Sequence, residues 1–229
     1  MNVKQRTALI AGLGLIMAAP STAARAQDKP AALTGKLPAK AECVVCSANG
    51  EAHGAEKPAA GMTYKGKTYY FCNKKEVAGF AKDPEAFLPP VLPRPAPALS
   101  LQSVRGSTTT LADLKGKVVL LDFWATWCAP CVKAMPDLQK MHDKYAGKNF
   151  AVVGISIDED GMKSVSPFLA KRKFTYPMLL DQNDTWQKYG VRAVPTLFLL
   201  DRNGNIVQQF TGTVDKSKLE KAVAATLGE

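Results

Sequence analysis

The stretch that decides the fold covers residues 118–131 and reads VVLLDFWATWCAPC. Its first half is apolar apart from one aspartate, which is typical of a central strand covered on both faces. Two cysteines, Cys128 and Cys131, follow where we expect a helix to begin, because Pro130 suits the first turn of a helix. The stretch therefore predicts a buried strand that delivers a pair of thiols to a helix N-terminus.

The residues around this stretch alternate strand and helix signals. Strands are expected at 118–124, 151–157, 196–200 and 206–210, and helices at 130–145, 162–172 and 216–227. An Asn203-Gly204 turn joins the last two strands, and residues 100–118 add a strand or hairpin in front. This order predicts an α/β fold with a mixed central sheet and helices on both faces.

The spacing of Cys128 and Cys131 indicates dithiol chemistry. A helix N-terminus stabilises a thiolate, so Cys128 is expected to be the exposed nucleophile and Cys131 the recessed resolving thiol. Cys128 would attack a partner disulfide, and Cys131 would then attack the mixed disulfide and release the reduced partner. The alternatives are an inert disulfide or half of a zinc site, but this region offers no second pair of zinc ligands.

Asp122 lies within the apolar strand that leads to the cysteines. Burial there should raise the pKa of its carboxyl group, which would let it exchange a proton with Cys131. The alternative is an aspartate that faces water at the edge of a sheet. We therefore place Asp122 with the two cysteines as a catalytic candidate.

The same stretch, with Pro136 five residues after the second cysteine and Val194-Pro195-Thr196 later, resembles the thioredoxin superfamily. Within it, the TlpA/ResA-like exported thiol-disulfide oxidoreductases are the most similar, and the resemblance covers residues 96–227. It implies a thioredoxin fold in which Pro195 follows a cis peptide bond and its loop docks the substrate backbone. The substrate-binding residues would be Trp127, Pro130, Val194, Pro195 and Thr196.

The resemblance also implies partners and limits. The expected partners are protein thiols and disulfides together with a membrane or periplasmic electron donor, and the redox reaction needs no cofactor. The TlpA/ResA-like pattern usually carries glutamate three residues after the second cysteine, where this chain has Ala134. The dithiol chemistry is therefore carried over, but a role in cytochrome maturation is not.

Residues 1–26 have the pattern of a secretory signal peptide. Lys4 and Arg6 precede an apolar run over residues 8–19, and the small-residue site Ala24-Arg25-Ala26 follows. The run is shorter than the roughly 20 residues that a membrane span needs, so cleavage is favoured over an uncleaved N-terminal anchor. The chain is therefore expected to be periplasmic or otherwise exported.

Composition divides the rest of the chain into modules. Residues 27–41 are rich in Ala, Lys and Pro without periodicity, which predicts a flexible lead-in. Residues 42–88 are expected to form a small unit with a β-hairpin and a helix. Prolines dominate residues 89–97, which predicts an extended linker, and the thioredoxin-like domain follows at 98–229.

The chain has five cysteines, so they cannot all pair within one molecule. Cys43, Cys46 and Cys72, the last of them in a Tyr-Tyr-Phe-Cys run, give residues 42–88 a resemblance to YHS or TRASH domains. Those small domains are associated with heavy metals, so the resemblance implies a site for zinc or copper(I). Glu76 stands where the family pattern commonly has a further cysteine, and a carboxylate suits zinc better than copper(I).

Two readings of this second cysteine group remain open. His53 is another candidate for the fourth ligand, although a lone histidine in a polar loop is more often solvated. The alternative to metal binding is a Cys43–Cys46 disulfide beside a buried Cys72, because an exported protein meets an oxidising compartment.

Charge and cysteine spacing also bear on the class of function. The net charge is +10, but the lysines are scattered without interleaved aromatic residues, which argues against nucleic-acid binding. A thioredoxin-fold peroxidase would need a lone peroxidatic cysteine instead of a Cys-Ala-Pro-Cys pair. A copper or zinc carrier or sensor would use its thioredoxin domain to keep the thiol ligands reduced. Disulfide exchange with partner proteins is the leading prediction.

Overall fold

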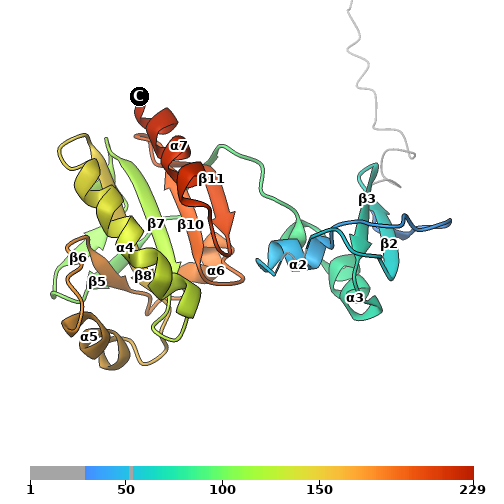
Figure 1. The fold of residues 1–229 in the computed structure, drawn as a ribbon, viewed down its shortest axis with the longest axis horizontal. Helices are drawn as coiled ribbons and strands as arrows, with labels where there is room; N and C mark the ends of the chain where they lie inside the picture. Colours follow the sequence, from blue (N-terminus) through green and yellow to red (C-terminus); the bar gives the residue numbers. More distant parts are fainter. Residues whose placement is uncertain (1–28, 52–53) are drawn as a thin grey trace, which may run out of the picture.

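The computed structural model describes residues 29–51 and 54–229 (Figure 1). The predicted signal peptide at residues 1–26 and the candidate ligand His53 lie outside these residues. The described chain builds two sheets, one of three strands and one of eight. A search of the described helices finds none that is both long enough and apolar enough to cross a membrane.

The eight-stranded sheet carries the predicted α/β fold. Its strand order is β4-β11-β10-β7-β8-β9-β5-β6, in which β7, β8 and β9 run parallel and the other neighbours are antiparallel. The strands are β4 (Arg94–Pro95), β5 (Ser100–Ser103), β6 (Thr108–Thr110), β7 (Val118–Trp124), β8 (Phe150–Ser156), β9 (Met178–Leu180), β10 (Thr196–Leu200) and β11 (Asn205–Thr211). The whole of β7 is buried, as expected for a strand covered on both faces.

Helices lie on both faces of this sheet, which makes it the predicted thioredoxin fold. The helices are α4 (Ala129–Lys144), α5 (Met162–Ala170), α6 (Thr185–Tyr189) and α7 (Lys216–Leu227). Even-numbered residues of β7 such as Leu120 and Trp124 pack in one core cluster with α4, α5 and α7. Odd-numbered residues such as Leu121 pack in a second cluster with Tyr189 of α6. This division follows from the two-residue repeat of a strand.

The three-stranded sheet has a small core of its own. It joins β1 (Ala31–Ala32), β2 (Ala60–Tyr64) and β3 (Lys67–Phe71), and its flanking elements are α2 (Val44–Ala48), α3 (Lys74–Lys82) and the 3-10 helix η1 (Glu85–Phe87). Phe80 of α3 is fully buried and its ring contacts the rings of Tyr64, Tyr69, Phe71 and Phe87. A core this thin gains much from any further cross-link.

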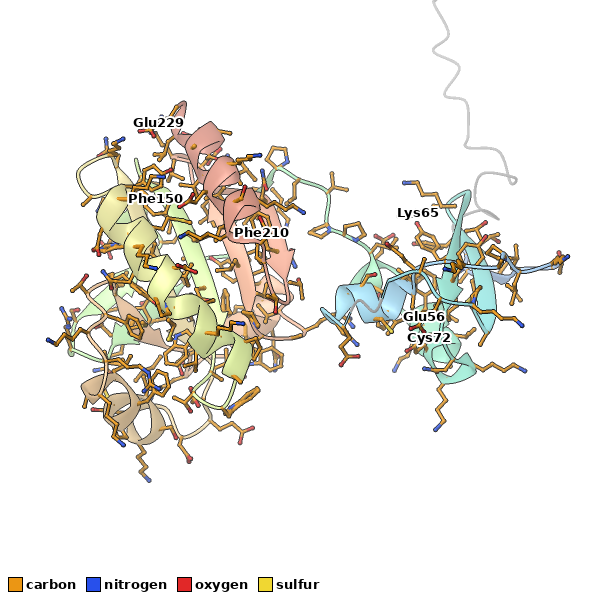
Figure 2. The ribbon with its side chains drawn as sticks, viewed as in Figure 1. Glu56, Lys65, Cys72, Phe150, Phe210 and Glu229 are labelled. Atoms are coloured by element: carbon orange, nitrogen blue, oxygen red, sulfur yellow. A yellow bond between two sulfur atoms is a disulfide. The ribbon has the colours of Figure 1, made fainter. Side chains whose placement is uncertain are left out.

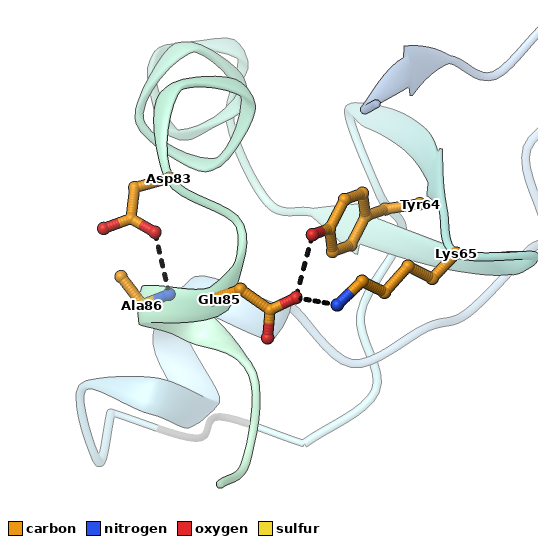
Figure 3. A network of polar contacts seen from close by, with 5 residues as sticks. All are labelled: Tyr64, Lys65, Asp83, Glu85 and Ala86. Carbon is orange, nitrogen blue, oxygen red and sulfur yellow. Dashed lines mark hydrogen bonds and ion pairs between the residues drawn. The ribbon is translucent and has the colours of Figure 1, made fainter. Parts of the chain in front are cut away.

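A polar network ties η1 to the hairpin of the small sheet (Figure 3). Glu85 accepts hydrogen bonds from Tyr64 Oη at 2.8 Å and from Lys65 Nζ at 2.5 Å. The hydrogen bond from Lys65 lowers the pKa of the Glu85 carboxyl group. Asp83 accepts from the backbone N–H of Ala86 at 3.2 Å. The network joins η1 to the β2–β3 hairpin, and exposed pairs of this kind add little stability.

The segments predicted to be irregular are more ordered than the sequence indicates. Ala31 pairs with Thr63, so the lead-in at 27–41 contains a strand and is not flexible throughout. In the proline-rich segment, β4 pairs with β11 and Arg94 donates to the carbonyl oxygen of Tyr189 at 3.2 Å. The second half of the predicted extended linker therefore packs on the large sheet and does not act as a spacer. Prolines fit there because an edge strand leaves N–H positions unpaired.

Candidate redox site and cysteine cluster

The sequence places Cys128 and Cys131 at the start of α4, directly after the buried strand β7. The two residues form a disulfide with a Cα–Cα distance of 5.3 Å. Cys128 is the N-cap of the helix, and its Sγ accepts a hydrogen bond from the backbone N–H of Cys131 at 3.2 Å. In the reduced state the same N–H and the helix dipole would stabilise a thiolate on Cys128. The local geometry thus supports the assignment of Cys128 as the nucleophile. The prediction that Cys128 is exposed was wrong for the disulfide form, because Cys128 is 4% exposed and Cys131 1%.

The loop before β10 brings Pro195 next to this helix terminus. The Val194–Pro195 peptide bond is cis, as predicted. Thr196 pairs with Phe123 at the end of β7, and its Oγ1 donates to the carbonyl oxygen of Ala193 at 2.7 Å. Because antiparallel register fixes which residues face each other, the loop must lie beside the end of β7 from which the cysteines follow.

A cavity of about 340 Å³ connects several of the predicted site residues. Its lining includes Asp122, Pro130 and Pro195, together with apolar side chains from α4 and α7. Trp127, directly before the nucleophile, is 69% exposed and stands outside this cavity. An exposed tryptophan next to a reactive sulfur offers apolar surface to a protein substrate.

Asp122 is buried beneath the site, with 1% of its surface exposed. It lies on the face of β7 that α4 covers, between Leu120 and Trp124 in the two-residue repeat. Among the described residues its Oδ2 atom has no hydrogen-bond partner. Burial raises the pKa of the Asp122 carboxyl group to about 7, so the group can take up or release a proton near neutral pH.

Asp158 is a site residue that sequence reasoning missed. It follows β8 and is 5% exposed. Its carboxylate accepts hydrogen bonds from Thr126 N at 3.0 Å, Thr126 Oγ1 at 2.5 Å and Ser156 Oγ at 2.7 Å. Asp158 thereby anchors the loop that carries Trp127 and Cys128. The signal in the sequence was an aspartate directly after a buried strand, which is common and points to no particular partner.

We expect the Asp158→Ala substitution to destabilise the fold. It would leave two donors of Thr126 and one of Ser156 without their acceptor, and each buried donor left unpaired costs about 1–3 kcal/mol. The free energy of unfolding in urea should therefore fall by about 3 kcal/mol or more. The matched control is Glu159→Ala, since Glu159 is exposed next to it. Equal unfolding midpoints for the two variants would contradict the anchoring role.

The second group of cysteines also comes together. Cys43 is the N-cap of α2, Cys46 lies in that helix, Cys72 follows β3, and Glu76 lies in the first turn of α3. Cys46 Sγ lies 3.5 Å from Cys72 Sγ, and Glu76 Oε2 lies 3.1 Å from Cys43 Sγ and 3.4 Å from Cys72 Sγ. All four ligand atoms lie within 4.8 Å of one another. Burial raises the pKa of the Cys46 thiol.

This donor set fits a zinc ion. Tetrahedral zinc has Zn–S bonds of about 2.3 Å, which places its sulfur ligands roughly 3.8 Å apart. The separation of 3.5 Å between Cys46 Sγ and Cys72 Sγ is close to that value. A carboxylate oxygen is a common zinc ligand, whereas copper(I) prefers soft sulfur donors. The three sulfurs are not joined by a disulfide, in contrast to the Cys43–Cys46 alternative raised by the sequence.

The cysteine cluster and the redox site belong to regions that contact each other. Gly50, just after α2, lies so close to Gly212 that a Cβ atom on Gly212 would come within 2.9 Å of Gly50 O. Gly212 in turn donates its N–H to Pro195 O at 2.9 Å. The Arg192 guanidinium lies 4.3 Å from the centre of the Phe87 ring. The turn after α2 and the η1 helix therefore contact Gly212 and Arg192, which lie close to the cis-proline loop.

The comparisons with known proteins concern the large sheet. A family model described as Redoxin matches residues 93–226. The thioredoxin-like protein YneN of Bacillus subtilis (strain 168) is 39% identical over 128 residues, which cover 55% of this chain and 75% of that protein. The thiol-disulfide oxidoreductase ResA of Bacillus anthracis is 36% identical over 129 residues, which cover 55% of this chain and 72% of that protein.

Solved structures similar to this chain include proteins of the same kind. The crystal structure of a thiol:disulfide interchange protein of the thioredoxin family from Chlorobium tepidum TLS has a TM-score of 0.54 and 29% sequence identity to this chain. The match covers 61% of this chain and all of the other one, 100%. Because the family model spans more than half of the sequence, the chain belongs to the Redoxin family.

Proposed function

We propose that this chain is an exported thiol-disulfide oxidoreductase that exchanges disulfides with partner proteins. The observation that carries the proposal is the Cys128–Cys131 disulfide at the start of α4, next to a cis Pro195 and above a buried Asp122. The relatives named thiol-disulfide oxidoreductase and thiol:disulfide interchange protein support the same chemistry.

The mechanism follows from the positions of the three groups. In the reduced protein the Cys128 thiolate attacks a sulfur of the partner disulfide, which forms a mixed disulfide and expels the other partner sulfur as a thiolate. Cys131 then loses its proton to the Asp122 carboxylate and attacks Cys128 Sγ, which releases the second partner sulfur. The products are a Cys128–Cys131 disulfide and a partner dithiol. The reverse sequence oxidises a partner dithiol.

The pairing of the two cysteines favours disulfide exchange over peroxide reduction. A peroxidatic cysteine is oxidised by peroxide itself, whereas Cys128 is already paired with a cysteine three residues away in the same helix turn. The family match alone does not separate these activities. The dithiol therefore provides the reason to prefer partner disulfides as substrates.

Insulin provides the direct test of this proposal. The reduced chain should accelerate the dithiothreitol-dependent precipitation of insulin well above dithiothreitol alone. The same preparation should consume hydrogen peroxide no faster than an equal concentration of free dithiothreitol. Insulin precipitation at the background rate, with the protein folded by circular dichroism, would refute the exchange function.

We also propose the location and the division of the chain. Residues 1–26 would direct export and be removed, and an electron donor in the membrane or periplasm would re-reduce the dithiol. The small module at 42–88 and the thioredoxin-like domain at 98–229 would act as two units joined at 89–97. Their separate core clusters support this division.

The small module is proposed to hold zinc through Cys43, Cys46, Cys72 and Glu76. These four residues come from three separate elements, so a bound ion would tie those elements together where the apolar core is thin. Zinc at 100 times its dissociation constant would stabilise the module by about 2.7 kcal/mol.

Chelation tests the zinc proposal. Adding a chelator to the zinc-loaded chain should lower the melting temperature of the module in calorimetry, and the Glu76→Gln variant should bind zinc at least tenfold more weakly. Glu56→Gln is the matched control, because Glu56 lines the same pocket without being one of the four grouped donors (Figure 2). Identical melting curves with and without zinc would count against the site.

A further inference from the structure

We propose that Cys46 and Cys72 are a second redox-active pair, and that the Cys128–Cys131 dithiol of this chain reduces their disulfide. The inference rests on the proposed function, because it makes the small module a substrate of the thioredoxin-like domain. It also links the redox state of the chain to metal binding, since both sulfurs belong to the proposed zinc ligands.

The distances select the pair. Cys46 Sγ and Cys72 Sγ are 3.5 Å apart, so an approach of roughly 1.5 Å would bring them to the length of a disulfide bond. Cys43 Sγ is engaged differently, because it caps α2 by accepting from Cys46 N at 3.5 Å. The structure therefore favours Cys46–Cys72 over the Cys43–Cys46 pairing that the sequence spacing suggests.

The two sulfurs differ in their exposure to solvent, as a redox pair that exchanges with another thiol requires. Cys46 is buried, whereas Cys72 is partly exposed at the end of β3 (Figure 2). Both line a pocket whose rim includes Glu56, Lys57 and Tyr70. An incoming thiolate would meet Cys72 first and displace Cys46.

The contact between the two regions supports the small module as a substrate of the thioredoxin-like domain. Gly50, four residues after Cys46, touches Gly212, whose N–H binds Pro195 O. The turn after α2 therefore contacts the segment after β11, which lines the same cavity as Pro130 and Pro195. Residues 89–93 join the two regions and contain no helix or strand.

The reaction is balanced without an outside oxidant or reductant. The Cys128 thiolate attacks Cys72 Sγ, the Cys46–Cys72 bond breaks, and Cys46 leaves as a thiolate that takes up a proton. Cys131 then gives up its proton and attacks Cys128 Sγ, which frees Cys72. Two electrons move from one cysteine pair to the other, and the Cys128–Cys131 disulfide forms as the Cys46–Cys72 disulfide is lost.

Oxidation of this pair and metal binding exclude each other. A Cys46–Cys72 disulfide removes two of the four grouped donors and leaves Cys43 with Glu76. Two ligands hold zinc far more weakly than four. Reduction by the neighbouring dithiol would therefore restore the site, and the thioredoxin-like domain would set how much of the module can hold metal.

Mapping the disulfides of the unaltered chain is the first test. Oxidised glutathione, followed by alkylation of free thiols and mass spectrometry, should show Cys46–Cys72 and Cys128–Cys131 with Cys43 as the one alkylated cysteine. A metallochromic dye should report release of bound zinc as the Cys46–Cys72 disulfide forms. A Cys43–Cys46 disulfide, or zinc retained after full oxidation, would overturn the proposal.

The transfer is tested between two full-length variants. One carries Cys128→Ser and Cys131→Ser and is oxidised at Cys46–Cys72, and the other carries Cys46→Ser and Cys72→Ser and is reduced at Cys128–Cys131. We expect the variant reduced at Cys128–Cys131 to reduce the Cys46–Cys72 disulfide of the other variant at least tenfold faster than glutathione does at the same thiol concentration. If the reduced variant acts on insulin but not on Cys46–Cys72, the inference fails while the proposed function stands. If the reduced variant acts on neither insulin nor the Cys46–Cys72 disulfide, the inference and the proposed function both fail.

Discussion

A Cys128→Ser variant is expected to reduce insulin no faster than the uncatalysed background, because serine at that position cannot form the mixed disulfide. The Cys128 sulfur is the N-cap atom of α4 and receives the N–H of Cys131 at 3.2 Å, which stabilises a thiolate there. Cys43 caps α2 in a similar way at 3.5 Å, but it lies in the small module and not beside the cis-proline loop. The measurement is the initial rate of insulin precipitation with each variant at equal concentration.

The Cys131→Ser variant should behave differently. Its Cys128 thiolate still attacks, but the mixed disulfide has no resolving thiol and accumulates. Non-reducing electrophoresis of the variant after exposure to an extract of exported proteins should show covalent adducts that disappear with dithiothreitol. These adducts should be absent from the double variant Cys128→Ser, Cys131→Ser.

Cys43→Ser is the control for these two variants. Cys43 lies in the small module and its sulfur contacts Glu76, away from the α4 terminus, so insulin reduction should stay within twofold of the unaltered chain. Loss of activity in Cys43→Ser equal to that in Cys128→Ser would mean that the wrong sulfur had been assigned. Adducts formed through a cysteine other than Cys128 would lead to the same conclusion.

The sequence predicted the central part of the fold because its signals there are local and strong. The apolar run of β7 and the amphipathic pattern of α7 gave the observed bounds, and β8 differed by one residue at each end. The turn at Asn203-Gly204 correctly joined β10 and β11. These elements bury large apolar faces, so their pattern in the sequence is unambiguous.

Other features depended on contacts between distant residues and were not predicted. The strand β9 has three residues and α6 has five, which is too short for a periodic pattern. The pairing of β4 with β11 was not predicted, because the proline-rich composition indicated only an extended linker. The anchoring role of Asp158 depends on Thr126, 32 residues away in sequence, and no local signal reports such a partner.

The candidate sites show the same difference between features with a local sequence signal and features that depend on distant contacts. Cys128, Cys131 and the cis bond before Pro195 were predicted from short motifs, and the structure places them together at one end of β7. In the small module the sequence named the four grouped donors and kept a Cys43–Cys46 disulfide as the alternative to metal binding. Which sulfurs lie nearest to each other could not be predicted, because the fold of β3 against α2 brings Cys72 to Cys46.

The ionisation of Asp122 should make the stability of the chain depend on pH. Its pKa is raised from 3.8 to about 7 by burial, so the folded state holds a proton that the unfolded state has already released between these values. The contribution of protonated Asp122 to the free energy of unfolding is therefore fully present below pH 3.8 and is lost as the pH rises towards about 7. A difference of about 3 pKa units corresponds to roughly 4 kcal/mol in the free energy of unfolding.

Replacing Asp122 with asparagine should abolish the loss of stability between pH 3.8 and about 7. It should also slow the step in which Cys131 resolves the mixed disulfide. The amide cannot ionise, so urea unfolding at pH 8 should show a more stable protein, by about 1–3 kcal/mol after the roughly 1–3 kcal/mol cost of burying an unpaired amide. The same substitution removes the proton acceptor for Cys131, and positioned acid-base groups contribute about 10²–10⁴-fold. The resolving step, followed by stopped-flow fluorescence of the tryptophans, should slow by about 100-fold near pH 7.

The two effects have opposite signs, which separates this role from simple structural damage. A substitution that merely disturbed the core would lower both the free energy of unfolding and the rate of the resolving step. Loss of the buried charge of Asp122 raises the free energy of unfolding at pH 8 and lowers that rate. The exposed control Glu159→Gln should change neither quantity, because Glu159 stands on the surface beside Asp158. An Asp122→Asn variant that unfolds more easily than the unaltered chain at pH 8, with an unchanged resolving rate, would show that the buried carboxyl group neither ionises there nor serves Cys131.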